Sequence, residues 1–478
     1  MNRRMICRVL GLVLLIEAVM MLVPALVALF YGENLTPWGI SIAATAGVGG
    51  LMLAAVPQKS VLYAREGFIS VALSWLLMSA FGALPLRLSG EVTHYADAMF
   101  EIVSGFTTTG ASILLDVEGM SRGLLFWRSM THWIGGLGVL VFILAVLPLA
   151  NNNAMHIMRA EVPGPTVGKI VPRARDTARI LYLIYFALTV IETIFLLAGG
   201  MPLYDALIHA FGTAGTGGFS NRALSVGAYN SPYIEWVIGV FLVLFSINFN
   251  LYYFILCGGV RDALRDQELH LFGALVLLTT GIITIDILPL FDGFSSAVRH
   301  AFFQVMSITS TAGFATADFN LWPEVSRWVL VLLMFCGACA GSTGGGIKIG
   351  RILLMGRAAR CEIRRMSRPR TVNRVMVNGK AVDDETLRGS LIFFFLYILM
   401  LIVGTLLVSF DGFDTTTNFT AVLSCLSNVG PGLGLVGPMG NFAMYSVFSK
   451  IILTAAMLIG RLEIFPILIL FSPSLWKR

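Results

Sequence analysis

The chain alternates between long apolar runs and shorter segments that are rich in glycine, threonine and charged residues. Each apolar run holds roughly 20 residues, the length that crosses about 30 Å of hydrocarbon as a helix. The runs lie near residues 8–30, 37–57, 67–86, 124–150, 178–199, 233–258, 270–290, 327–356, 389–409 and 444–471. The pattern predicts an all-α polytopic membrane protein with ten transmembrane helices.

Four of the intervening segments carry an additional apolar stretch that is too short to cross a membrane. These stretches cover residues 96–105, 204–213, 298–308 and 416–425. Each leads into a turn that closes on a glycine, and these glycines are Gly110, Gly218, Gly313 and Gly430. We expect each stretch to enter the membrane as a half-helix and to return as extended backbone.

The spacing of the four glycines indicates an internal repeat. Successive glycines are 108, 95 and 117 residues apart, which leaves room for one short stretch and two spans each time. We therefore expect two N-terminal transmembrane helices followed by four pseudo-symmetric helix–pore loop–helix repeats around one central path. The expected boundaries are 1–60 for the N-terminal pair and 61–158, 159–262, 263–375 and 376–478 for the repeats.

Glycine-bearing turns at membrane depth favour a cation path. Irregular backbone is tolerated there only where it is buried in protein or lines a water-filled route. Backbone carbonyls that face an axis replace the water around a monovalent cation without a trapped negative charge, and glycine leaves the axis free of a Cβ atom. A single such turn is usually a packing notch, whereas four in shared register indicate a selectivity filter.

The distribution of basic residues predicts the orientation. With a cytoplasmic N-terminus, the inner segments hold 24 of the 33 Lys and Arg residues and the outer segments hold six. The positive-inside rule then places both termini in the cytoplasm and all four glycine turns on the opposite side.

The amino-acid composition excludes several other classes of protein. A chain with 57% hydrophobic residues, 13% charged residues and a mean hydropathy of +0.82 does not form soluble domains. The net charge of +6 follows from the topology, so it indicates contact with anionic lipid rather than nucleic acid. No acid–base pair, nucleophile or metal cluster is recognisable, and Cys336 and Cys339 lie inside an apolar run, so we expect neither an enzyme nor a redox site.

Several polar residues within or beside the predicted spans have simpler interpretations. We expect Glu17, Glu192 and Lys450 to pair with neighbouring helices or to lie near an interface. His132, His209 and His300 are placed near the outer ends of their segments, and none has a partner four residues away that would indicate a metal site.

The turns and two further motifs carry a family resemblance. The motifs are Ser104-Gly-Phe-Thr-Thr-Thr-Gly110, Gly215-Thr-Gly-Gly218-Phe-Ser, Thr309-Ser-Thr-Ala-Gly313-Phe, Ser427-Asn-Val-Gly430-Pro-Gly, Gly341-Ser-Thr-Gly-Gly-Gly346-Ile-Lys and Gly460-Arg-Leu-Glu463. With these motifs, essentially the whole chain resembles the Trk/Ktr/HKT superfamily of potassium transporters, most closely the bacterial Trk-type membrane subunit.

The resemblance implies a filter with one glycine per repeat. The implied K⁺-binding residues are Thr108, Thr109, Gly110, Thr216, Gly217, Gly218, Thr311, Ala312, Gly313, Asn428, Val429 and Gly430. Some plant relatives that favour sodium carry serine at the first position, whereas this chain has Gly110, which points to potassium. The fourth turn departs from the others at Asn428, Val429 and Pro431, so the symmetry is only approximate.

The run over 327–356 is interrupted in its middle by glycine and small polar residues. Five glycines between 337 and 346 break a helix, since each costs about 1 kcal/mol relative to alanine. A phosphate-binding loop is excluded because Ile347 separates Gly346 from Lys348. The interruption is either a tightly packed kink or, as the resemblance implies, a flexible loop across the path.

Gate candidates follow from this loop and from nearby charge. They are Gly341, Ser342, Thr343, Gly344, Gly345, Gly346, Lys348 and Arg461. Arg461 places a positive charge at membrane depth, where an ionisable side chain is by default a functional hypothesis. Pairing with Glu463 is an alternative role for Arg461 that is compatible with gating.

The expected function is gated, channel-like potassium uptake across the bacterial inner membrane. The resemblance also implies a homodimer and a cytoplasmic nucleotide-binding regulatory subunit of the Trk-A (RCK) type, while this chain needs no cofactor beyond the transported K⁺. The basic stretch from Arg357 to Arg388 is either a docking surface for that subunit or an ordinary positive-inside loop. A coupled symporter of K⁺ with H⁺ or Na⁺ is the alternative, although it predicts inverted repeats whereas these run parallel.

Overall fold

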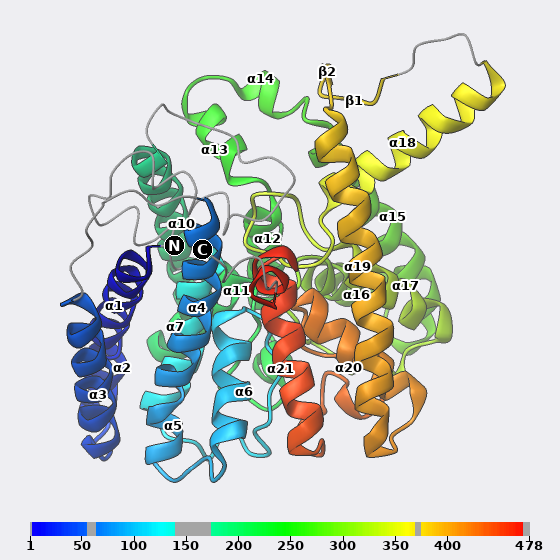
Figure 1. Cartoon of the computed structure of the whole chain (residues 1–478). Coiled ribbons are helices and arrows are strands. Elements are labelled where there is room, and N and C mark those ends of the chain that lie inside the picture. The colour runs from blue at the N-terminus through cyan, green and yellow to red at the C-terminus, as the bar shows by residue number, and fades with distance from the viewer. Residues whose placement is uncertain (1, 55–63, 139–173, 369–373, 472–478) are drawn as a thin grey trace.

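The computed structural model describes residues 2–54, 64–138, 174–368 and 374–471. This part of the chain is mostly helical, with a single two-stranded hairpin, β1 (Met376–Val377) and β2 (Lys380–Ala381). Figure 1 shows the helices gathered side by side in one bundle, with α13, α14, the hairpin and α18 projecting at one end. The ranges between the described residues include Lys59, most of the predicted inner segment Arg159–Arg179, and part of the basic stretch after Arg357.

Helices α1 (Arg3–Met20), α2 (Leu22–Phe30) and α3 (Thr36–Leu53) form the N-terminal part. Four groups of elements follow, and each contains a long helix, a short helix, a glycine turn and a second helix (Figure 1). The groups are α4 (Ala64–Gly82), α6 (Tyr95–Phe106) and α7 (Arg122–Gly136); α10 (Ala174–Ala198), α11 (Leu203–Gly215) and α12 (Pro232–Ser246); α15 (Gln267–Ile287), α16 (Phe294–Thr309) and α17 (Glu324–Cys336); and α19 (Asp384–Val408), α20 (Thr415–Ser427) and α21 (Val447–Arg461).

Further elements connect these helices. The α-helical ones are α5 (Leu84–Leu88), α13 (Phe249–Leu256), α14 (Val260–Ala263), α18 (Ile349–Ser367) and α22 (Phe465–Leu468), and single 3₁₀ turns cover Ser225–Tyr229, Leu288–Leu290, Phe319–Leu321, Ser409–Asp411, Gly434–Val436 and Ile469–Phe471.

The long helices carry the apolar outer surface. Leu277 and Ile285 of α15 are each 76% exposed, and Leu406 of α19 is 67% exposed. So many outward-facing large apolar side chains are unfavourable in water and favourable in lipid. Trp75, Trp127 and other large side chains fill the interior, where the short helices pack against the long ones.

The second helices are too short to cross a bilayer. The four second helices α7, α12, α17 and α21 hold 15, 15, 13 and 15 residues, so each is only about 20 Å long at 1.5 Å per residue. Six helical segments in the described chain are long and apolar enough to span, or seven when the bent pair α12 and α13 counts as one. The expectation of a helical membrane protein is thus confirmed, whereas the number of ten spans is not.

The predicted runs 124–150, 233–258, 327–356 and 444–471 are not single helices. α12 and α13 meet at 88°, where Ile247 is extended and Asn248 starts the next helix by accepting a hydrogen bond from the Asn250 amide at 3.0 Å. After α21, Glu463 and Ile464 adopt positive φ angles of 55° and 66°. α7 ends at Gly136, and residues 139–150 of its predicted run lie outside the described residues.

Polar caps fix where several of the remaining helices begin. Asp414 accepts a hydrogen bond from the Thr417 amide at 3.0 Å and so starts α20. Asp266 accepts one from the Leu269 amide at 2.9 Å at the start of α15. Carboxylates at this position satisfy amides that have no partner within the helix and also favour the positive end of its dipole.

Candidate ion pathway

All four glycine turns share one backbone conformation. The residue two positions before the glycine has a positive φ in every turn, and so does the glycine. These angles are 53° at Thr108, 54° at Thr216, 65° at Thr311 and 58° at Asn428, then 81° at Gly110, 75° at Gly218, 77° at Gly313 and 100° at Gly430. Residues other than glycine rarely adopt a positive φ. Its occurrence at the same position in all four turns therefore indicates a specific conformation that the repeats share.

The hydrogen bonds that end the short helices are also the same in each turn. The amide of the residue before the glycine donates to the carbonyl five residues earlier. The pairs are Thr109 to Ser104 at 2.8 Å, Gly217 to Gly212 at 2.8 Å, Ala312 to Ser307 at 2.8 Å and Val429 to Ser424 at 2.9 Å. This bond, together with a left-handed residue just before it, forms a Schellman motif.

The four turns meet one another in a closed ring. A methyl group on Gly110 would lie 2.0 Å from the Gly217 carbonyl oxygen, and one on Gly218 would lie 1.9 Å from that of Ala312. One on Gly313 would lie 2.2 Å from the Val429 oxygen, and one on Gly430 would lie 2.7 Å from that of Thr109. The first turn therefore contacts the second, the second the third, the third the fourth, and the fourth the first.

A small cavity opens at this ring. It has a volume of about 160 Å³, and its lining includes all four glycines. The carbonyls of the residue before each glycine lie between neighbouring turns, and carbonyl dipoles in such a ring can replace the water around a cation. Each short helix also ends here with its partially negative terminus.

The fourth turn keeps the common backbone despite its different sequence. Asparagine tolerates the left-handed conformation better than most residues, because its short polar side chain bonds locally. The Asn428 Nδ2 atom donates to Thr109 Oγ1 and to the Met457 carbonyl, each at 2.9 Å. Asn428 thus joins the fourth turn to the first.

The interruption after α17 folds into a loop whose two ends meet. The amides of Ile347 and Lys348 donate to the carbonyls of Phe335 and Cys336, each at 3.1 Å. The Lys348 ammonium bonds the Gly344 carbonyl inside the loop. We call residues 337–348 the intramembrane loop.

The intramembrane loop contacts the third and fourth turns. The Gly345 amide donates to Thr311 Oγ1 at 2.7 Å, and the Gly346 amide donates to the Ser427 carbonyl at 2.9 Å. A methyl group on Gly345 would lie 2.3 Å from that same Ser427 oxygen. The loop therefore lies directly against the ends of α16 and α20.

Arg461 joins the intramembrane loop to the end of α7. Its guanidinium donates to the Thr343 carbonyl at 2.8 Å, and to the Gly135 and Gly136 carbonyls at 2.6 and 2.5 Å. These last two residues end α7. One buried arginine from α21 thus connects the loop to the first group of helices.

Two carboxylates hold the loop and the helix that follows it. Glu463 accepts hydrogen bonds from both terminal nitrogens of Arg351 in α18, at 3.1 and 2.5 Å. Glu268 of α15 accepts one from the Ala340 amide at 2.7 Å. Sequence reasoning considered Glu463 only as a partner of Arg461 and did not select Arg351 or Glu268.

Some polar residues within the spans have the partners expected from the sequence, and others do not. Lys450 pairs with Asp97 at 2.7 Å, as expected for a contact with a neighbouring helix. Among the described residues, neither carboxylate oxygen of the buried Glu17 has a hydrogen-bond partner, so the expected pairing is not found for this residue. Glu192 of α10 lies within reach of the Thr213 side chain of the neighbouring α11, a contact of the expected kind. His132 is fully buried against the second turn rather than lying near an outer end.

Fold and site together define a membrane transport protein whose short helices end in a ring of backbone turns. Comparison with known proteins identifies the family. A family model described as "Cation transport protein" (TrkH) matches residues 40–288 and 292–478, and the chain belongs to this TrkH family.

Relatives match over the full length of the chain. The potassium uptake protein TrkH of Salmonella typhimurium is 37% identical and covers 100% of both chains. TrkG of Escherichia coli is 36% identical over 99% of each chain. The crystal structure of the potassium transporter TrkH from Vibrio parahaemolyticus superimposes with a TM-score of 0.90 at 34% identity and covers both chains completely.

Proposed function

We propose that this protein takes up potassium through a filter made by the four glycine turns. The observation that carries the proposal is the ring, in which every glycine Cα lies against the carbonyl that precedes the next glycine. Relatives named as potassium uptake proteins support the choice of ion. The four groups of helices then act as four repeats around one path.

The filter ligands are backbone oxygens from the turns. The carbonyls of Thr109, Gly217, Ala312 and Val429 occupy equivalent places in the ring, and neighbouring atoms of Thr108, Thr216, Thr311 and Asn428 extend the site. Neutral carbonyls favour a weakly hydrated K⁺, which is released again because no fixed negative charge holds it. The same ring would discriminate poorly if one glycine gained a side chain and moved its neighbour.

The intramembrane loop is the gate in this proposal. Its contacts with Thr311 and Ser427 support a position across the route that an ion takes after leaving the ring. Arg461 adds a positive charge to the barrier and fixes the loop to the end of α7. For the gate to open, the hydrogen bond between the Arg461 guanidinium and the Thr343 carbonyl must break, or the loop and Arg461 must move together.

A partner operates the gate in this proposal. The subunit is a cytoplasmic nucleotide-binding protein of the Trk-A type, and the pore chain forms a homodimer in the inner membrane with both termini inside. α18 continues from the loop and carries basic residues on its exposed surface, which supports a docking role for that end. Movement of α18 would then reach the loop through Lys348.

Flux into liposomes tests the function. Purified protein should accumulate K⁺ when the interior is held negative, and a potential of 100 mV supplies about 2.3 kcal/mol per charge. The same uptake with and without H⁺ or Na⁺ gradients separates channel-like permeation from symport. Potential-driven K⁺ uptake that is independent of both gradients is expected, whereas uptake that requires one of them would make the protein a coupled transporter.

A further inference from the structure

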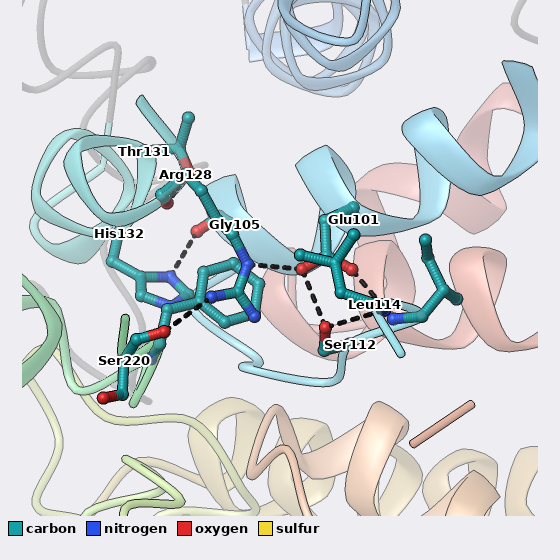
Figure 2. A network of polar contacts seen from close by, with 10 residues as sticks. Glu101, Gly105, Ser112, Leu114, Arg128, Thr131, His132 and Ser220 are labelled. Atoms are coloured by element: carbon teal, nitrogen blue, oxygen red, sulfur yellow. Dashed lines mark hydrogen bonds and ion pairs between the residues drawn. The ribbon is translucent and has the colours of Figure 1, made fainter. Parts of the chain in front are cut away.

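Two side chains of α7, Arg128 and His132, reach α6 on one side and the backbone after the second turn on the other. Glu101 and Gly105 lie four residues apart on α6, and Arg128 and His132 lie four residues apart on α7. Residues four apart share one face of a helix, so the two crossings lie one helical turn apart. Figure 2 shows both crossings, with Ser220 at their far side.

The first crossing is a buried ion pair. Arg128 Nε donates to Glu101 Oε1 at 2.5 Å, and the two side chains are 4% and 0% exposed. The other carboxylate oxygen accepts a hydrogen bond from the Ile113 amide at 2.9 Å, just after the first turn. Arg128 also donates to the Ser220 carbonyl at 3.1 Å and lies over the Phe219 ring, 3.4 Å from its centre.

The second crossing is a neutral imidazole. The Phe219 amide donates to His132 Nε2 at 3.3 Å, so the proton of the ring is on Nδ1, which donates to the Gly105 carbonyl at 2.7 Å. A methyl group on Gly217 would lie 2.4 Å from this ring. His132 therefore spans from the first short helix to the second turn through backbone groups at both ends.

Together these contacts fix the distance between the first and second turns. Both side chains bind α6 on one side and residues 219–220 on the other, immediately after Gly218. Arg128 also lines the cavity that contains the four glycines. Its positive charge would repel cations there if Glu101 did not compensate it.

We propose that Glu101, Arg128 and His132 are positioning residues for ion selectivity. They hold the second turn in register with the first, so that the Gly217 carbonyl stays in the ring. The ion pair does this without adding net charge to the cavity at the ring. This inference rests on the proposed function, because selectivity has meaning only if the ring conducts cations.

Reversal potentials in planar bilayers with K⁺ on one side and Na⁺ on the other test the inference. The variants are Glu101→Gln, Arg128→Gln, the double variant, and His132→Leu. We expect the K⁺ over Na⁺ permeability ratio to fall roughly tenfold in the double variant and in His132→Leu, the size expected when discrimination changes by the worth of one hydrogen bond to a charged group.

Conductance separates positioning from simple charge. Glu101→Gln leaves the arginine uncompensated, so its K⁺ conductance should fall. The double variant removes that charge, so its conductance should recover while its permeability ratio stays low. A role of Glu101 and Arg128 in folding alone would leave the ratio of every correctly folded variant unchanged.

A matched ion pair serves as the control. Glu235 of α12 and Arg299 of α16 also join a second helix to a short helix, at 2.8 Å, but Arg299 lies near the start of its short helix. Glu235→Gln with Arg299→Gln should keep the wild-type ratio. Wild-type ratios within twofold in both the double variant and His132→Leu, with native melting temperatures, would overturn the inference. Absence of K⁺ preference in the wild type would instead refute the proposed function.

Discussion

At the scale of single residues, the glycines of the ring are constrained twice. Gly110 has a φ of 81° and no room for a Cβ atom, because the Gly217 oxygen occupies that place. Conformation alone would permit asparagine, as Asn428 demonstrates in the left-handed position of the fourth turn. The contact with the neighbouring carbonyl is what excludes any side chain at the glycine itself.

Gly110→Ser should raise sodium permeation relative to potassium. The serine Cβ must displace the Gly217 carbonyl, and we expect the K⁺ over Na⁺ permeability ratio to fall roughly tenfold, equivalent to about 1.4 kcal/mol. Reversal potentials under K⁺ and Na⁺ gradients measure this ratio. Gly90→Ser is the matched control, because Gly90 has a φ of 84° with open space around it. An unchanged ratio in Gly110→Ser would remove this residue from the filter.

The residues of the ring could be predicted from the sequence, but their network could not. Four glycines in shared register pointed to one site, because the repeat is visible in the spacing. Arg128 counted only as one of six outer basic residues, since its partner Glu101 lies 27 positions earlier. The i, i+4 spacing of Arg128 and His132 was the available signal, and it gains meaning only when α6 is known to lie beside α7.

At the scale of elements, the second helices share one property that their hydropathy conceals. Each ends near the level of the glycine turns, although the apolar runs continue beyond those points. Sequence reasoning found only the break after α17, because five glycines mark it. The 88° bend between α12 and α13 has no glycine, and the signal there is the polar pair Asn248 and Asn250.

Deletion of residues 338–345 should increase potassium flux in the absence of the regulatory partner. The remaining ends can join without stretching the chain, since a methyl group on Gly346 would lie 2.7 Å from the Gly337 Cα atom. Liposome flux measures the effect, with size-exclusion chromatography to confirm folded protein. An equal or lower rate in folded protein would show that the loop is not the barrier.

Arg461→Ala should also increase conductance, because it removes the charge and frees the loop from the Gly135 and Gly136 carbonyls. Arg461→Lys keeps the charge but has a single ammonium in place of the planar fork, so we expect its conductance to lie between those of wild type and Arg461→Ala. Single-channel recordings compare the three proteins. Wild-type conductance and normal regulation in folded Arg461→Ala would leave Arg461 with a packing role only.

At the scale of the whole molecule, the bundle has two different ends. The cavity at the glycine ring is lined partly by residues of the loops that follow the turns. The helices α13, α14 and α18 and the hairpin project together at one end of the bundle (Figure 1). The excess of basic residues at this end predicts that it faces the cytoplasm. The sequence predicts from charge counts alone that the glycine turns and the basic segments face opposite sides of the membrane. This prediction depends on no contact between distant residues.

A native cysteine can test this orientation. Cys257 is exposed and lies between α13 and α14, so a membrane-impermeant maleimide should label it in inside-out vesicles and not in intact cells. Variants that lack the other cysteines give the cleanest comparison. A cysteine introduced at the exposed Asp292, between α15 and α16, should show the reverse pattern. Labelling of Cys257 in intact cells would invert the proposed topology.

The most direct test of the central claim is the position of a bound ion. Rb⁺ replaces K⁺ and can be located by its anomalous X-ray scattering in crystals of the protein. The account predicts a peak on the axis of the ring, enclosed by the carbonyl oxygens of Thr109, Gly217, Ala312 and Val429. Protein that conducts Rb⁺ in liposomes but binds it elsewhere, with no peak inside this ring, would contradict the account.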